Sequence, residues 1–161
     1  AVMLSAETAV GKYPVETVKA MARVIEGAEK HPLAQRSKHR LDETFQRIDE
    51  SLALSAMYVA NHLQGVKAVI CMTEPGFTPL LMSRITSSLP IYAMAAKLGT
   101  CEITALYKGV VPVPCDTSQL EPSEVHHLAV EQFRDYGPVT HGAPLLITQG
   151  GAIKRPGGRN T

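Results

Sequence analysis

AVICMTEPGFTPLLMSRI, residues 68–85, decides the fold, because an apolar run, a turn and a helix-forming segment follow one another. The run Ala68–Met72 has the composition of a fully buried strand, and Thr78–Ile85 is predicted to be a helix. The pattern repeats downstream, with strands predicted at Ile91–Ala95, Val110–Val113 and Pro144–Thr148 and helices at Leu98–Leu106 and Pro122–Tyr136. Short apolar runs separated by helices predict an α/β fold, a three-layer α/β/α sandwich with a mostly parallel sheet of about 4–5 strands.

One more helix is predicted immediately before this alternation. Asp49 is a suitable N-terminal cap, the helix extends to Leu63, and Gly65 follows its end. Its apolar residues cover most of its circumference, which predicts burial on several sides. They are Leu52, Ala53, Leu54, Ala56, Met57, Tyr58, Val59, Ala60 and Leu63.

The beginning of the chain predicts a separate strand–loop–helix unit. Ala1–Leu4 is apolar and is expected to be a buried strand, followed by a polar loop at Ser5–Lys12. Pro14 suits the first turn of a helix, which Pro32 ends. Gln35–Arg40 is basic with little that is apolar, which is typical of a linker. We expect a piece of a longer polypeptide with three regions: residues 1–31, a linker at 32–41, and a domain at 42–161.

Composition and charge argue against several classes of partner. The chain is 45% hydrophobic and 19% charged, and its net charge of +1 provides no overall field to attract nucleic acid or an anionic membrane. No apolar run approaches the roughly 20 residues that span a bilayer, so we expect no membrane partner and a cytoplasmic location. Cys71, Cys101 and Cys115 are too widely spaced for a disulfide framework or a CxxC metal site, which predicts reduced structural thiols.

The histidines offer weak candidates for metal binding. His126 and His127 are adjacent, and neighbours on a helix point in different directions. No cysteine or acidic residue stands at ligand spacing from them, so we predict no metal site. His62 is predicted to end its helix as a hydrogen-bonded residue.

Several segments resemble the pyruvate kinase family in the same order along the chain. The longest is AVMLSAETAVGKYP, residues 1–14, which resembles the family's eighth barrel strand and the start of the following helix. The others are Glu16–Arg23, Ala28–Lys30, Ser55–Leu63, Met82–Arg84, Pro90–Met94, Ala105–Val110 and Leu146–Gly150. The resemblance is strongest to bacterial enzymes of the type activated by AMP or sugar monophosphates.

The resemblance implies a parent enzyme that transfers a phosphoryl group from phosphoenolpyruvate to ADP, using Mg²⁺ and often K⁺. Residues 1–31 would complete its catalytic (β/α)8 barrel, and residues 42–161 would form its C-terminal effector-binding domain. The family's catalytic lysine and metal ligands would lie upstream of Ala1, so we expect no catalytic residue, metal or cofactor in this chain and no activity from it alone. Its expected partners are the missing barrel, a sugar-phosphate or AMP effector, and other copies in a homotetramer.

Ser5, Glu7 and Thr8 follow the first predicted strand, at the end where barrel enzymes build their active sites. Two interpretations stay open: they edge the nucleotide side of the pocket or carry coupling between domains, or they hold a loop together by local hydrogen bonds. Ala6 stands where the family usually has Gly, so the backbone is expected to avoid positive φ there.

A loop of candidate phosphate-binding residues follows Met72. Thr73, Glu74, Gly76, Phe77 and Thr78 occupy the positions of the family's T-x-S-G-R-[ST] loop, which holds an effector phosphate. Hydroxyl and backbone N–H groups at such a turn bind anions. The family's Ser is replaced by Pro75 and its Arg by Phe77, and losing that charge-assisted contact costs about 1.5–3 kcal/mol. A plain strand-to-helix turn is therefore the alternative.

A second candidate segment is glycine-rich and carries three cations. Gly150, Lys154, Arg155, Gly157 and Arg159 match the family loop that closes over the effector, and the alternative is a solvated turn. Its cations would replace the charge missing at position 77. Two rival functions stay open beside a regulatory role: a stand-alone binding module for a nucleotide or sugar phosphate, and a structural interface domain with a defunct effector site.

Overall fold

The structure is a computed structural model that describes residues 2–31, 34, 44–120, 122–136 and 142–149. The chain divides into two compact units, residues 1–37 and residues 38–161. The linker predicted at residues 32–41 falls almost wholly outside the described residues. In the described part, no helix is both long and apolar enough to cross a membrane.

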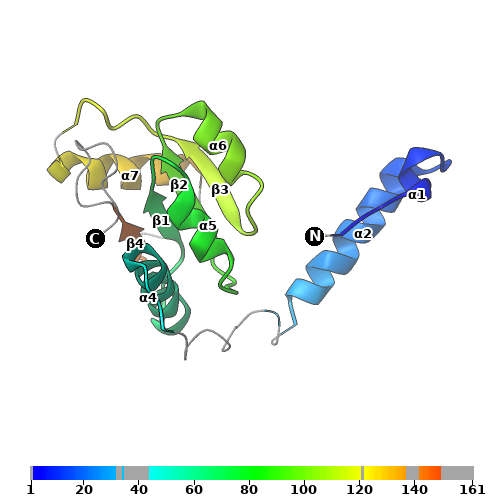
Figure 1. Cartoon of the computed structure of the whole chain (residues 1–161), viewed down its shortest axis with the longest axis horizontal. Helices are drawn as coiled ribbons and strands as arrows, with labels where there is room; N and C mark the ends of the chain where they lie inside the picture. Colours follow the sequence, from blue (N-terminus) through cyan, green and yellow to red (C-terminus); the bar gives the residue numbers. More distant parts are fainter. Residues whose placement is uncertain (1, 32–33, 35–43, 121, 137–141, 150–161) are drawn as a thin grey trace. The chain divides into compact units, whose positions relative to one another are not determined.

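The described part of the first unit includes two helices, α1 (Ala6–Ala9) and α2 (Pro14–Glu29) (Figure 1). The strand predicted at residues 1–4 is wrong: residues 2–4 form no strand, and Met3 is 86% exposed. A strand is stable only where its backbone groups pair with a neighbouring strand, and the described part of this unit contains no other. The polar loop predicted at residues 5–12 is also partly wrong, since α1 lies within it.

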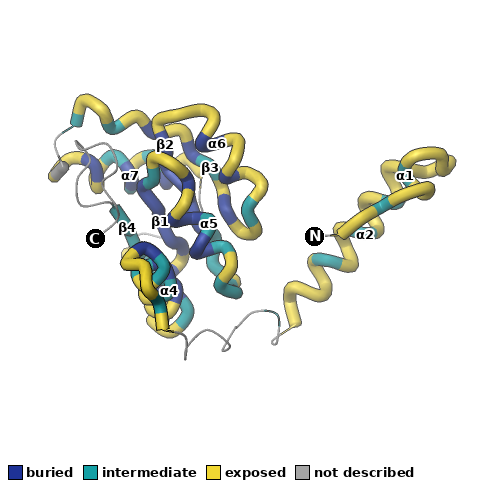
Figure 2. Tube along the Cα trace, viewed as in Figure 1, coloured by how far each residue is buried: buried dark blue, intermediate teal, exposed yellow. Residues whose placement is uncertain are grey.

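The second unit contains a parallel sheet of four strands among the described residues: β1 (Val69–Met72), β2 (Ile91–Ala95), β3 (Val110–Pro114) and β4 (Leu146–Thr148). The strand order is β3-β2-β1-β4, and every pairing is parallel. This confirms the predicted α/β fold and its strands to within one or two residues at each end. Every residue of β1 and β2 is buried, which explains why these strands are apolar without alternation (Figure 2).

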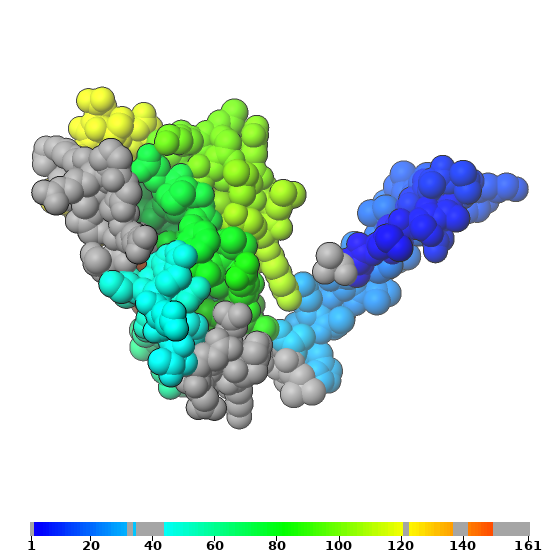
Figure 3. All heavy atoms as spheres, viewed as in Figure 1, coloured from blue at the N-terminus to red at the C-terminus, as the bar shows by residue number. Residues whose placement is uncertain are grey.

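In the described part of this unit, four helices accompany the sheet: α4 (Ile48–His62), α5 (Phe77–Ser83), α6 (Leu98–Thr104) and α7 (Pro122–Tyr136). Two core clusters occupy its two faces. One joins the strands to Ala53, Met57 and Ala60 of α4 and to Leu81 and Met82 of α5. The other joins them to Val125, Ala129 and Phe133 of α7. The helices thus form two layers around the strands, and α4 and α5 lie side by side (Figures 1 and 3).

Helix α4 is covered less completely than the sequence predicts. Its inward residues are buried, but Ile48, Tyr58, Val59 and Leu63 are 40–62% exposed. The prediction of burial on several sides is therefore wrong for the described residues, where one face of α4 packs on the sheet. Periodicity shows which residues are apolar, but the number of neighbours around a helix depends on tertiary packing.

The three cysteines are free and buried, as predicted for structural thiols. Cys71 is fully buried in β1, and burial raises the pKa of its thiol from 9.0 to about 12. Burial also raises the pKa of Cys101 and of Cys115. Because the thiolate is the reactive form, these residues serve as small core side chains.

Candidate functional site

The carboxyl edge of the sheet carries the candidate site. From β1 the chain passes to β2 on one side, whereas β4 pairs with β1 on the other, so the strand order reverses between β1 and β4. Cys71 and Thr148 are register partners, which brings the residues that follow the two strands close together. Ligands of open parallel sheets bind at such a reversal.

The loop after β1 is built by local hydrogen bonds. The backbone N–H of Thr73 donates to the carbonyl oxygen of Met94 at 3.0 Å, which continues the ladder with β2. The N–H of Gly76 donates to Thr73 Oγ1 at 3.0 Å, and Gly76 then adopts a left-handed backbone with φ 77°. The hydroxyl of Thr100 donates to the carbonyl oxygen of Glu74 at 2.8 Å. The loop is therefore fixed against both β2 and α6.

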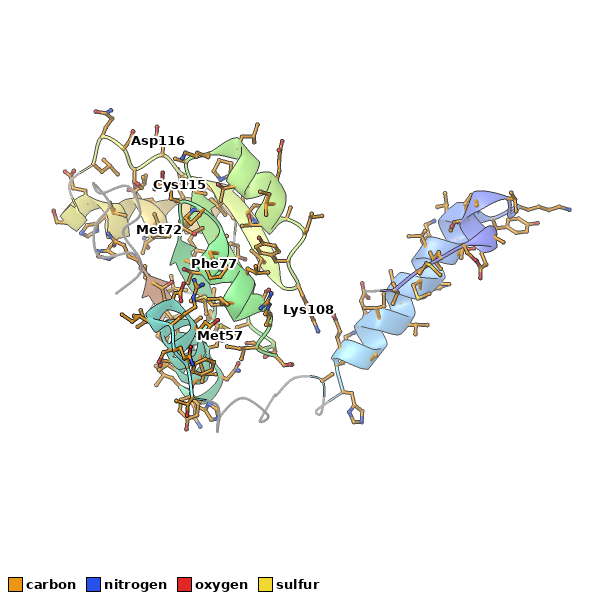
Figure 4. The ribbon with its side chains drawn as sticks, viewed as in Figure 1. Met57, Met72, Phe77, Lys108, Cys115 and Asp116 are labelled. Atoms are coloured by element: carbon orange, nitrogen blue, oxygen red, sulfur yellow. The ribbon has the colours of Figure 1, made fainter. Side chains whose placement is uncertain are left out.

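Charged groups flank this loop on two sides. Glu74 and Lys97 form an ion pair at 3.0 Å, with both side chains about two-thirds exposed. On the other side, the guanidinium carbon of Arg47 lies 4.8 Å from the centroid of the Phe77 ring. Phe77 is the first residue of α5 (Figure 4). Local sequence reasoning found only the loss of charge at position 77. It missed Arg47, which precedes α4 and is distant in sequence, and no spacing rule could have found it.

The predicted phosphate-binding residues divide into two groups. Thr73, Glu74, Gly76, Phe77 and Thr78 form one continuous loop and helix start, and Thr78 is only 8% exposed. The second group lies outside the described residues: Gly150, Lys154, Arg155, Gly157 and Arg159. The last described residue before that segment is Gln149, which directly follows β4 at the strand-order reversal.

Ser5, Glu7 and Thr8 make local contacts in the first unit. Glu7 Oε2 accepts the backbone N–H of Ser5 at 3.0 Å and its hydroxyl at 3.4 Å, and the Thr8 hydroxyl donates to the Ser5 carbonyl at 3.2 Å. Hydrogen bonds from the backbone N–H groups of Glu7 and Ser5 lower the pKa of the Glu7 carboxyl. Ala6 is helical, so the residue that replaces the family's Gly does avoid positive φ. These bonds hold the turn around α1 together.

The described histidines of the second unit lie on helices, and His62 makes contacts within its own helix. His62 Nδ1 lies 2.8 Å from the carbonyl oxygen of Tyr58, and the two rings stack at 4.1 Å, in line with its predicted place at a helix end. His126 and His127 are exposed on α7. Among the described residues, no group of three or more His, Cys, Asp or Glu side chains is arranged to hold a metal ion.

Comparison with known proteins gives a consistent result. Residues 50–161 match the family described as "Pyruvate kinase, alpha/beta domain". Pyruvate kinase II of Salmonella typhimurium is 53% identical over 161 residues, and pyruvate kinase of Haemophilus influenzae is 49% identical over 152 residues. The matches cover 100% and 94% of this chain but 33% and 31% of those relatives, so the chain spans about a third of their length.

A solved structure has the same fold. The crystal structure of a pyruvate kinase from Cryptosporidium parvum matches with a TM-score of 0.77 and 27% identity, over 96% of this chain and 31% of that one. The matched family covers the sheet, its helices and the loop after β1. The chain therefore belongs to the pyruvate kinase family, and its second unit carries the family's α/β domain.

Proposed function

We propose that this chain is the C-terminal, regulatory part of a cytoplasmic pyruvate kinase, which transfers a phosphoryl group from phosphoenolpyruvate to ADP. The match to a third of much longer pyruvate kinases supports this proposal. Mg²⁺ and K⁺ would serve the parent enzyme, but the described residues offer no group of metal ligands that fits them. We propose that both ions, and the phosphoryl transfer itself, belong to polypeptide outside this chain, because the chain spans about a third of the length of these relatives.

We further propose that the second unit binds an anionic effector, AMP or a sugar phosphate, at the carboxyl edge of its sheet. The observation that carries this proposal is the position of the Thr73–Thr78 loop, which lies where the strand order reverses between β1 and β4. The hydroxyl of Thr73 accepts the N–H of Gly76 and can still donate its own proton to a phosphate. Lys154, Arg155 and Arg159 follow β4 in sequence and would add positive charge.

A structural role without an effector is the second candidate, and two features of the loop favour it. Pro75 has no N–H to donate, and Arg47 beside Phe77 is already paired with Asp49. In this alternative the domain serves as a contact between subunits of a homotetramer. The exposed apolar residues Tyr58 and Val59 of α4, with Leu63 directly after the helix, would suit such a contact.

Thermal unfolding with a panel of ligands tests the regulatory proposal. With AMP, ribose 5-phosphate or glucose 6-phosphate at ten times its dissociation constant, we expect one ligand to stabilise the chain by about 1.4 kcal/mol, a rise of several degrees. Thr73→Ser retains the hydroxyl and should keep the shift, whereas Thr73→Val should lose it. No shift with any of the three ligands would contradict effector binding and favour the structural role.

The same preparation tests where the chemistry resides. With phosphoenolpyruvate, ADP, Mg²⁺ and K⁺, we expect no pyruvate above the no-protein control in a lactate dehydrogenase-coupled assay. A ligand shift without turnover supports a regulatory part of a larger enzyme. Turnover that persists after repeated purification would overturn the assignment of catalysis to polypeptide outside the chain.

A further inference from the structure

Arg47 links two segments that are far apart in the sequence. It immediately precedes α4 and has an extended backbone, with φ −112° and ψ 135°. Its side chain reaches across to α5, where the guanidinium carbon lies 4.8 Å from the centroid of the Phe77 ring. Phe77 is the first residue of α5 and directly follows Gly76. One side chain therefore contacts both Asp49 at the start of α4 and Phe77 within the Thr73–Thr78 loop.

Asp49 holds this guanidinium in place. Arg47 Nε donates to Asp49 Oδ1 at 3.0 Å, and Nη2 donates to Oδ2 at 2.5 Å, which is a two-pronged pairing. The N–H of Glu50 also donates to Asp49 Oδ1, at 3.0 Å. The Asp49 carboxylate is thus engaged at both oxygens, and the residue is only 7% exposed. Because Asp49 binds the N–H groups along the edge of the Arg47 guanidinium, the flat face of the guanidinium is left to pack on an aromatic ring.

This pair differs from the Glu74–Lys97 ion pair beside the Thr73–Thr78 loop. Glu74 and Lys97 are 67% and 69% exposed, and exposed pairs contribute little to stability. In the Arg47–Asp49 pair the Asp49 side chain is 10% exposed, so the negative charge of Asp49 is largely removed from water. Removing Arg47 would leave Asp49 without its cation and Phe77 without the group that covers it.

We propose that Asp49, Arg47 and Phe77 form a latch that couples the segment entering α4 to the Thr73–Thr78 loop. The coupling arises because both segments hold the same guanidinium, so that loosening either one weakens the hold on the other. Such coupling is reciprocal by thermodynamic necessity. A change at Phe77 is then transmitted to residues 44–49, the first described residues of the second unit. The latch is independent of any effector and goes beyond the proposed function.

Hydrogen–deuterium exchange of the chain without ligand tests the latch. Arg47→Gln removes the charge and Phe77→Leu removes the ring, while both keep similar size. We expect each variant to exchange about tenfold faster in both peptides 44–53 and 73–80. The double variant should exchange no faster than the faster single variant, because either change already opens the latch. Lys97→Gln is the matched control, and it should leave peptide 44–53 unchanged.

Two results would overturn the latch. One is faster exchange in Arg47→Gln confined to residues 44–53, which would make Arg47 a local cap of α4. The other is additive acceleration in the double variant, which would make the two contacts independent. Arg47→Lys is the conservative variant that controls for a folding defect, because it keeps the charge but loses the planar guanidinium. Exchange in both peptides should increase less in Arg47→Lys than in Arg47→Gln. Unchanged exchange in peptide 91–95 confirms an intact core in every variant.

Discussion

Phe133→Ala is expected to lower the free energy of unfolding of the second unit by about 3–5 kcal/mol. Phe133 is 1% exposed and heads the group of largest fully buried side chains among the described residues. Its ring meets that of Tyr92 edge to face, with the centroids 4.7 Å apart. The substitution leaves a cavity between α7 and the sheet, because the rigid strands beneath it cannot collapse into the space. Urea unfolding followed by circular dichroism measures the change.

Tyr136→Ala is the matched control on the same helix. The Tyr136 side chain is exposed, and it is the backbone carbonyl oxygen of Tyr136 that accepts a hydrogen bond from the Tyr92 hydroxyl, at 3.5 Å. Truncating this side chain should therefore change stability by less than about 1 kcal/mol. Equal losses in the two variants would mean that α7 does not pack on the sheet through Phe133.

Gly76→Ala is expected to cost about 2–3 kcal/mol, which combines a backbone and a packing effect. The φ of 77° at Gly76 lies in the left-handed region, which disfavours any residue with a Cβ. An added Cβ would also lie 3.1 Å from Thr104 Cγ2 and 3.3 Å from Thr100 Cγ2, both on α6. The loop after β1 and the start of α5 must then shift, and chemical denaturation measures the loss.

Gly99→Ala provides the control for this prediction. Gly99 lies in α6 with negative φ, and a Cβ there would meet nothing within 4 Å. Alanine is the better helix former, so this variant should be neutral or slightly more stable. A neutral Gly76→Ala would show that the turn is not held in the left-handed conformation.

The sheet was largely predictable from the sequence because its strands are buried on both faces. Ile91–Ala95 and Pro122–Tyr136 have the predicted bounds, and the other strands and helices of this unit differ by one or two residues. Continuous apolar runs leave little ambiguity when helices separate them. The Thr73–Thr78 loop was located for the same reason, since it directly follows a predicted strand.

The errors share a physical cause, which is dependence on neighbours that are distant in sequence. Residues 2–4 are apolar, but they form no strand because no partner strand pairs with them in the described unit. The outer face of α4 is apolar without being covered. Arg47 was missed because its contact with Phe77 depends on the side-by-side placement of α4 and α5, which only the fold reveals.

Among the residues that the structure describes, β3 is an edge strand, and this has a consequence for how copies of the protein can meet. Cys115 N–H donates to Ala95 and the Gly109 carbonyl accepts from Ile91, so odd-numbered residues of this strand face β2. Pro112 and Pro114 therefore lie at outward-facing positions, where neither has an N–H to offer. An added strand would find donors missing at alternate positions. This edge thus resists the strand-by-strand growth by which sheets of different molecules merge into aggregates.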